Sequence, residues 1–113
     1  TGLESIKLPE KLTVIRERTF DFCRLKNIEF PPGLEEIEAY AFTYCPLESI
    51  KLPEKLTVIR EGAFENCQLL RNVELPPNLE KIEARAFAEC YSLTIPYIAE
   101  TVDASETAFE RSR

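Results

Sequence analysis

The chain repeats itself, and this self-similarity limits its fold more strongly than any local propensity does. Residues Leu3–Glu17 (LESIKLPEKLTVIRE) recur without change at Leu47–Glu61, and two looser copies occupy residues 25–46 and 70–92. Self-similarity with a period of about 20–50 residues is typical of solenoids, in which each repeat is a rung that buries its apolar side chains against its neighbours. The sequence therefore predicts a stack of rungs with no single globular centre.

The predicted array has about five rungs of 22–23 residues. Four repeats lie at 3–24, 25–46, 47–69 and 70–92, and residues 93–113 form either a degenerate fifth repeat or a C-terminal cap. The cysteines mark the period, with spacings of 22, 22 and 23 residues between Cys23, Cys45, Cys67 and Cys90. The extra residue falls near Gln68-Leu69, and Ser112 stands where a fifth cysteine would fall. Since the chain lacks Met and starts two residues before a repeat, we expect a segment of a longer protein.

Each rung carries two short stretches of alternating apolar residues, which predict two columns of parallel strands. The first column is expected near residues 5–8, 27–30, 49–52 and 72–75, and a less regular second column near 13–15, 35–37, 57–59 and 80–82. A proline follows each first stretch and ends the strand, because it has no N–H for the ladder. Phe and Cys lie three residues apart near the end of each repeat, which predicts one tight helical turn with both side chains pointing inward.

The charged positions alternate in sign from one rung to the next. Three columns show this: Glu4, Lys26, Glu48 and Arg71; Lys7, Glu29, Lys51 and Glu74; and Arg16, Glu38, Arg60 and Glu83. Opposite charges on neighbouring strands attract each other, whereas stacked like charges would repel. The repeating unit is therefore a pair of rungs, duplicated once. The rows could form a ligand surface, but we interpret them as a ladder that neutralises itself and sets the register.

The repeat L-x-x-I-x-L-P-x-x-L-x-x-I-x-x-x-A-F-x-x-C, seen in LESIKLPEKLTVIREGAFENC at Leu47–Cys67, resembles the bacterial surface antigen A (BspA-like) type of leucine-rich repeat. The resemblance covers residues 3–92. It implies a right-handed leucine-rich repeat solenoid, mainly β with short helical turns. It also implies adhesion or protein binding by a secreted or cell-surface protein. The family usually has Gly after the second Ile, where this chain has Arg or Glu.

Composition excludes several classes of function. Lys plus Arg number 14 against 20 for Asp plus Glu, a net charge of −6, which argues against nucleic-acid binding. The apolar runs are too short for membrane insertion. With no His and no C-x-x-C pair, the sequence predicts neither a metal site nor a cofactor. We expect buried, reduced thiols; the alternative is a disulfide between neighbouring rungs, whose spacing suits a bridge.

The candidate binding residues are those that break the symmetry of the repeat. The position before each Cys reads Phe22, Tyr44, Asn66 and Glu89, and the position three residues after the second Ile reads Arg18, Tyr40, Gly62 and Arg85. Aromatic side chains are enriched at binding hot spots, and stacking does not require them in one half of the array. We therefore predict a contact patch of Phe22, Tyr40 and Tyr44. One alternative is that Phe22 packs against a further rung outside this segment, and another is that these rings only shield the turns.

The sequence thus favours a non-catalytic module that binds a protein partner. One alternative is a structural spacer within a larger repeat protein. The other is a parallel β-helix enzyme acting on carbohydrate. Such enzymes cluster Asp, but this chain has only Asp21 and Asp103, in different rungs. We therefore expect no enzyme activity.

Overall fold

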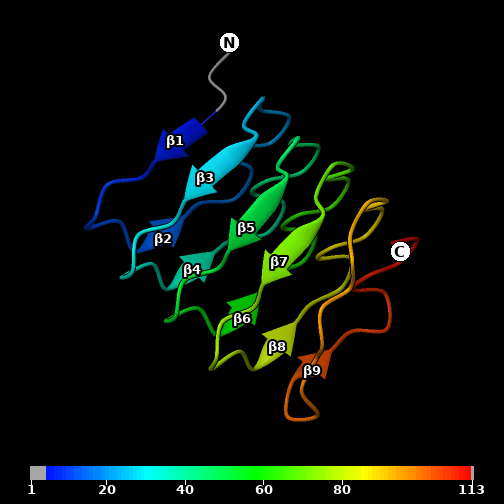
Figure 1. The fold of residues 1–113 in the computed structure, drawn as a ribbon. Coiled ribbons are helices and arrows are strands. Elements are labelled where there is room, and N and C mark those ends of the chain that lie inside the picture. Colours follow the sequence, from blue (N-terminus) through cyan, green and yellow to red (C-terminus); the bar gives the residue numbers. More distant parts are fainter. Residues whose placement is uncertain (1–4, 113) are drawn as a thin grey trace.

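The computed structural model describes residues 5–112 and shows a flattened solenoid of stacked rungs (Figure 1). All of its strands are short and pair in parallel. They are β1 Ser5–Lys7, β2 Val14–Ile15, β3 Asn27–Glu29, β4 Glu36–Ile37, β5 Ser49–Lys51, β6 Val58–Ile59, β7 Asn72–Glu74, β8 Lys81–Ile82 and β9 Asp103–Ala104. Both predicted strand columns are confirmed, with bounds that differ by one residue.

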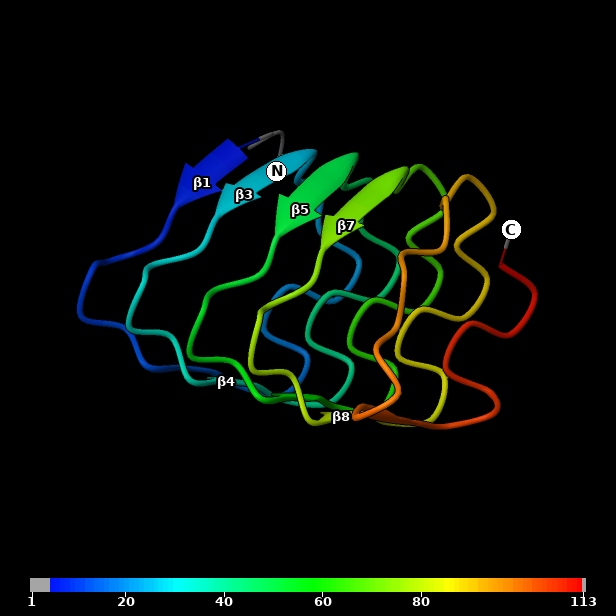
Figure 2. The ribbon, with the colours of Figure 1, turned by 60° about the horizontal axis from the view of Figure 1, so that its bottom comes forward.

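The two strand columns lie on opposite sides of the stack (Figure 2). One column is a continuous sheet in the order β2-β4-β6-β8-β9. The other is divided into the pairs β1-β3 and β5-β7, although β3 and β5 remain neighbours. Each of these strand pairs therefore takes one strand from each of the two rungs of a duplicated unit. The register places equivalent residues side by side, as in Ile15 beside Ile37 and Ile6 beside Ile28.

The core is built from columns of identical or similar apolar residues. Phe42, Phe64 and Phe87 are fully buried, and their rings stack on one another at 5.2 and 5.4 Å between centroids. Phe20 and Phe109 extend this row at its two ends, at 5.1 and 5.3 Å from their neighbours. The second Ile and the Leu columns are also buried: Ile15, Ile37, Ile59 and Ile82, with Leu34, Leu56 and Leu79. Every rung thus covers the apolar side chains of the next.

The cysteines follow the phenylalanine row. All four are free thiols, as predicted, and Cys45, Cys67 and Cys90 are buried. The prediction of full burial is wrong for Cys23, which is only half-buried. Among the described residues, a neighbouring rung covers Cys23 from one side only.

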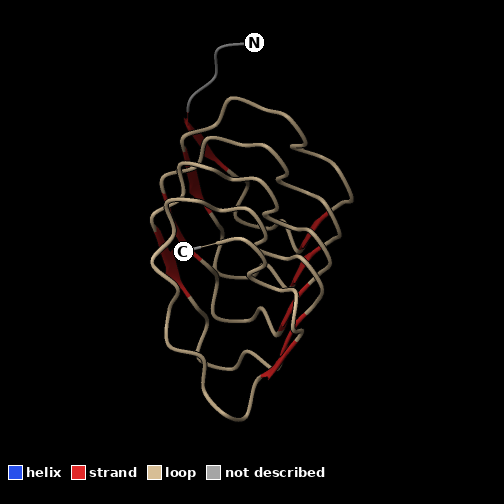
Figure 3. Cartoon of the chain, turned by 90° about the vertical axis from the view of Figure 1, so that its right-hand side faces the viewer, coloured by secondary structure: helices blue, strands red, loops and turns tan. Residues whose placement is uncertain are grey.

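The segment that carries Phe and Cys is not a helical turn, so that part of the prediction is wrong. Within the described residues there is no helix, and the chain runs through linked β-turns instead (Figure 3). In the first rung the N–H groups of Thr19, Asp21 and Cys23 each bond to the carbonyl three residues back, at 3.1–3.2 Å. The N–H groups of Phe20 and Phe22 point to the next rung, where they bond to carbonyls at 2.9 and 2.8 Å. Donors that alternate in this way hold the rungs together, which a helix could not do.

The last part of the chain stacks on the fourth rung. Its strand β9 pairs with β8, and the Phe109 ring stacks on Phe87. The Ser112 hydroxyl donates to the Phe87 carbonyl at 2.5 Å, in the place of a cysteine thiol. No strand of the first column forms over residues 93–99, where Pro96 has no N–H to give.

The charge ladders form ion pairs between rungs. Lys7 pairs with Glu29 at 3.9 Å and Arg71 with Glu48 at 3.9 Å. Arg16 pairs with Glu38 at 3.3 Å and Arg60 with Glu83 at 3.4 Å. Lys51 lies in register with Glu74, and Glu4 lies outside the described residues. Arg60 makes a further pair with Glu36 at 3.4 Å, so that it bridges three consecutive rungs. The predicted alternation of sign therefore pairs opposite charges.

Arg60→Glu should place a carboxylate between Glu36 and Glu83 and destabilise the chain by roughly 0.5–1.5 kcal/mol at low salt. The loss should shrink as salt screens the repulsion. Urea denaturation at two salt concentrations measures it. Lys55→Glu makes the same charge change at an exposed site outside the ladders and is the matched control. Equal losses for both variants, or a loss independent of salt, would contradict the ladder.

Phe64→Ala should remove a fully buried ring with stacked neighbours on both faces and cost about 3–5 kcal/mol. Phe20→Ala should cost less, because Phe20 has one stacked neighbour in the described rungs and is only half-buried. Denaturant midpoints of the two variants test this difference. Similar midpoints would mean that stacking on two neighbours in the phenylalanine row stabilises the chain no more than stacking on one.

Candidate interaction surface

One edge of the solenoid is made of the linked β-turns, and two columns of residues on it have positive φ. The first holds Arg18, Tyr40, Gly62 and Arg85, and the second Phe22, Tyr44, Asn66, Glu89 and Arg111, all with φ between 57° and 63°. Arg18 and Phe22, for example, each stand third in a four-residue turn closed by a backbone hydrogen bond, the position at which a type II turn requires this conformation. Gly and Asn adopt it readily, but bulky residues do so at a cost. The backbone therefore does not favour aromatic residues at these positions.

Phe22 and Tyr44 form an exposed aromatic pair. Their rings stack with 4.5 Å between centroids and 7° between planes. Phe22 is 66% exposed and Tyr44 49%, so that most of this apolar surface faces solvent. The prediction that the two residues lie side by side on neighbouring rungs agrees with this geometry.

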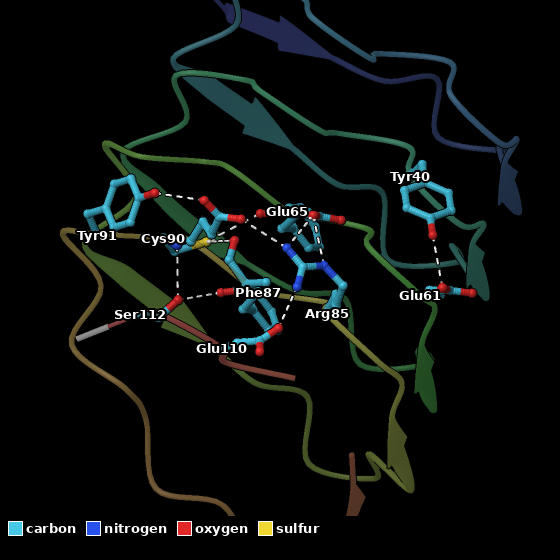
Figure 4. A network of polar contacts seen from close by, with 12 residues as sticks. Tyr40, Glu61, Glu65, Arg85, Phe87, Cys90, Tyr91, Glu110 and Ser112 are labelled. Carbon is cyan, nitrogen blue, oxygen red and sulfur yellow. Dashed lines mark hydrogen bonds and ion pairs between the residues drawn. The ribbon is translucent and has the colours of Figure 1, made fainter. Parts of the chain in front are cut away.

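Tyr40 is on the same turn segment as Tyr44 but in the other column, with different contacts. The Arg18 guanidinium carbon lies 4.8 Å from the centroid of the Tyr40 ring. Its hydroxyl donates to Glu61 at 2.9 Å, and this hydrogen bond raises the pKa of Tyr40 (Figure 4). The ring also covers Gly62, where a Cβ would come within 2.3 Å of it. The structure thus joins Phe22 to Tyr44, whereas Tyr40 packs between two residues of its own column.

A groove of about 330 Å³ lies beside Tyr44. Its lining residues are Tyr44, Cys45, Pro46, Asn66, Gln68 and Leu69. The groove lies where two connections of different length meet. Cys45-Pro46-Leu47 links one turn segment to the next strand directly. In the following rung a β-turn, closed by the Leu70 N–H to the Cys67 carbonyl at 3.1 Å, accommodates one extra residue.

Leu69 and Tyr91 were missed by the symmetry argument. Leu69, at the tip of the longer connection, is 51% exposed. Tyr91 is at the corresponding turn of the next rung, is exposed, and donates to Glu89 at 2.7 Å. This hydrogen bond raises the pKa of Tyr91 and lowers that of Glu89. The one-residue insertion at Gln68-Leu69 was the signal available in the sequence, because an inserted residue must project from the stack. Together Phe22, Tyr44, Leu69 and Tyr91 are called the edge strip below.

A charged network borders the edge strip over the later rungs. Arg85 binds Glu65 through Nε and Nη2 at 2.9 and 2.8 Å, and Glu89 at 2.9 Å. It also pairs with Glu110, so that three rungs meet at one guanidinium (Figure 4). The hydrogen bond to Glu65 is the main reason that the pKa of Arg85 is raised. The stacked aromatic pair therefore lies on the first two rungs, whereas Arg85 and its carboxylates lie on the later ones.

No metal centre or membrane span emerges from the described residues. Between residues 5 and 112 there is no group of three or more Cys, Asp or Glu side chains placed to hold a metal ion. The same residues contain no helix with the length and apolarity needed to cross a membrane.

Gly62→Ala should destabilise the chain by about 1–3 kcal/mol, because Ala must adopt positive φ and its Cβ meets the Tyr40 ring. Tyr40→Ser in the same chain should restore part of the loss by removing the ring. Gly33→Ala, where an added Cβ meets nothing within 4 Å, is the control and should cost little. Thermal or urea unfolding of the unchanged chain, Gly62→Ala, Tyr40→Ser and the double variant forms a double-mutant cycle. Strict additivity would show that Tyr40 does not pack on Gly62.

Comparison with known proteins agrees with this geometry. The chain is similar to the pneumococcal vaccine antigen PcpA, with 29% identity and a TM-score of 0.80 over 96% of this chain and 28% of that one. It also shares its fold with a leucine-rich repeat protein from Bacteroides ovatus ATCC 8483, at 21% identity and a TM-score of 0.52 over 88% of this chain and 38% of that one. The chain thus spans less than two fifths of either protein.

A search of curated protein sequences found no match. The sequence profile described as "BspA type Leucine rich repeat region" matches residues 1–113 in six copies. The chain belongs to the BspA type leucine-rich repeat family.

Proposed function

We propose that this chain is a non-catalytic protein-binding module and that the edge strip, with Tyr40 beside it, is its contact surface. The observation that carries the proposal is the exposed stack of Phe22 on Tyr44. Both side chains occupy backbone positions with positive φ, at 60° and 58°. An aromatic residue in that conformation is strained by about 1–3 kcal/mol, and a ring that stays largely exposed gains less from burial than a core ring does. A contact with another protein would account for both.

Hydrogen bonds between rungs hold the backbone beneath the aromatic pair. The Phe22 N–H bonds to the Thr43 carbonyl at 2.8 Å, and the Tyr44 N–H to the Glu65 carbonyl at 3.1 Å. The stacked rings restrict each other further. A surface ordered in advance loses little entropy on binding, which raises affinity for a given contact area. The groove between Tyr44 and Leu69 offers space for an apolar side chain of the partner.

The similarity to a vaccine antigen supports adhesion or ligand binding at a cell surface, or by a secreted protein. The chain covers 28% of that antigen, so this role is proposed for a segment of an array. The alternative is a structural spacer, which the self-paired charge ladders favour. In a spacer the edge strip would contact nothing, and its aromatic residues could be replaced without consequence.

The double variant Phe22→Asn/Tyr44→Asn separates these two functions. Asn is chosen because Asn66 occupies the same column with φ 63°, so the backbone accepts it. We expect the unfolding midpoint to stay the same or to rise. Binding to immobilised extracellular-matrix proteins, followed by biolayer interferometry, should weaken by roughly 30-fold or more, the effect of losing a hot spot.

Tyr97→Asn is the matched control, because Tyr97 is 84% exposed and lies outside the edge strip. This variant should bind like the unchanged chain. Equal binding by the double variant would place the contact surface elsewhere. Failure of the unchanged chain to bind any matrix protein would favour the spacer. Adding Tyr40→Ser to the double variant then measures the contribution of Tyr40 to binding.

A further inference from the structure

Three of the four cysteine thiols make the same hydrogen bond, and Cys23 is the exception. Cys45, Cys67 and Cys90 each donate to the carbonyl of the phenylalanine in the preceding rung, at 2.9, 3.2 and 3.3 Å. Ser112 does the same with its hydroxyl. Within the described residues the Cys23 thiol makes no such contact with a phenylalanine carbonyl.

The Cys23 thiol contacts another thiol instead. Its Sγ lies 2.9 Å from Cys45 Sγ, closer than two sulfur atoms in ordinary van der Waals contact. No other pair of thiols makes such a contact within residues 5–112. Cys23 is also the one cysteine of the four that solvent reaches, since the other three are buried. The two requirements for oxidation, access and a nearby second thiol, therefore meet at this end of the column.

We propose that Cys23 and Cys45 form an oxidation site, at which a small disulfide compound such as oxidised glutathione converts the two thiols into a disulfide between the first two rungs. The Cys23 thiolate attacks the small disulfide, which forms a mixed disulfide and releases one small thiolate that takes up a proton. The Cys45 sulfur, having lost its proton, then attacks the Cys23 sulfur and expels the second small thiolate. Two protein S–H bonds are oxidised to one S–S bond, and one small disulfide is reduced to two thiols.

The order of these steps follows from burial. Burial raises the pKa of the Cys45 thiol, and its hydrogen bond to Cys23 adds to this effect. A buried thiol of raised pKa is a poor first nucleophile, so reaction begins at the accessible Cys23. Burial also raises the pKa of Cys67, and it raises that of Cys90 to about 12. Neither has a thiol in contact, so both should stay reduced.

Bond formation requires little movement. Neighbouring rungs are one strand spacing apart, about 4.8 Å, which falls within the usual Cα separation of disulfides. The sulfur atoms need to approach by less than about 1 Å to reach the S–S bond length. The new bond would lie directly behind Phe22 and Tyr44, the residues that precede the two cysteines.

The test uses the whole chain, equilibrated with oxidised and reduced glutathione, quenched with acid, denatured and then labelled with a maleimide. We expect two labelled thiols, an intact mass lower by two hydrogen atoms, and a peptide that joins Cys23 to Cys45. The unfolding midpoint should rise on oxidation and return with dithiothreitol, because the cross-link restricts the unfolded chain.

Cys23→Ser should abolish the mass loss and leave three labelled thiols. Cys67→Ser should still lose the mass of two hydrogen atoms, and Cys90→Ser serves the same purpose if that variant does not fold. Serine fits this column, as Ser112 shows. Four thiols in the oxidised wild-type chain, a stable glutathione adduct on Cys23 without ring closure, disulfide-linked dimers, or a bond to Cys67 or Cys90 would each overturn the proposal.

Discussion

The spacing between rungs is the constraint on which the rest of this structure depends. Backbone hydrogen bonds between rungs fix it, and they run through both strand columns and through the linked turns. Phenylalanine rings stacked at 5.1–5.4 Å tolerate the same spacing, as do ion pairs between side chains of neighbouring rungs. One repeat distance thus serves three kinds of interaction at once. In the core columns and the charge ladders, each side chain stacks on a similar side chain or on an opposite charge.

The linked turns connect this constraint to function. Alternate N–H groups must point toward the next rung, and the chain achieves this by placing two residues of each turn segment at positive φ. Phe22 and Tyr44 at these positions are exposed and lie outside the core. They can therefore change with little effect on the core, which makes this part of the edge suitable for evolving a contact surface. Phe22 stacked on Tyr44 in one column, and Arg85 with its glutamates in the other, show that this edge accommodates different kinds of side chain.

The repetition made most of the fold predictable, because identical residues one period apart must stack. It predicted both strand columns, the phenylalanine row and the sign of the charge ladders. It also placed Phe22 beside Tyr44. The helical turn was wrong, because the spacing of Phe and Cys suits either a helix or linked turns, and only inter-rung hydrogen bonds decide between them. Contacts between columns, such as Tyr40 on Gly62, Arg60 with Glu36 and the exposure of Leu69, depend on side-chain directions that a column alignment does not contain.

The charge ladders restrict how many rungs the array can gain or lose while opposite charges stay paired. Loss of the second rung alone would set Lys7 beside Lys51 and Arg16 beside Arg60. Loss of the second and third rungs together would set Lys7 beside Glu74 and restore attraction. Recombination between the identical segments at residues 3–17 and 47–61 changes the length by two rungs, which preserves every ladder. Arrays of this kind should therefore gain or lose an even number of rungs. Gain or loss of an odd number would place like charges side by side on neighbouring rungs.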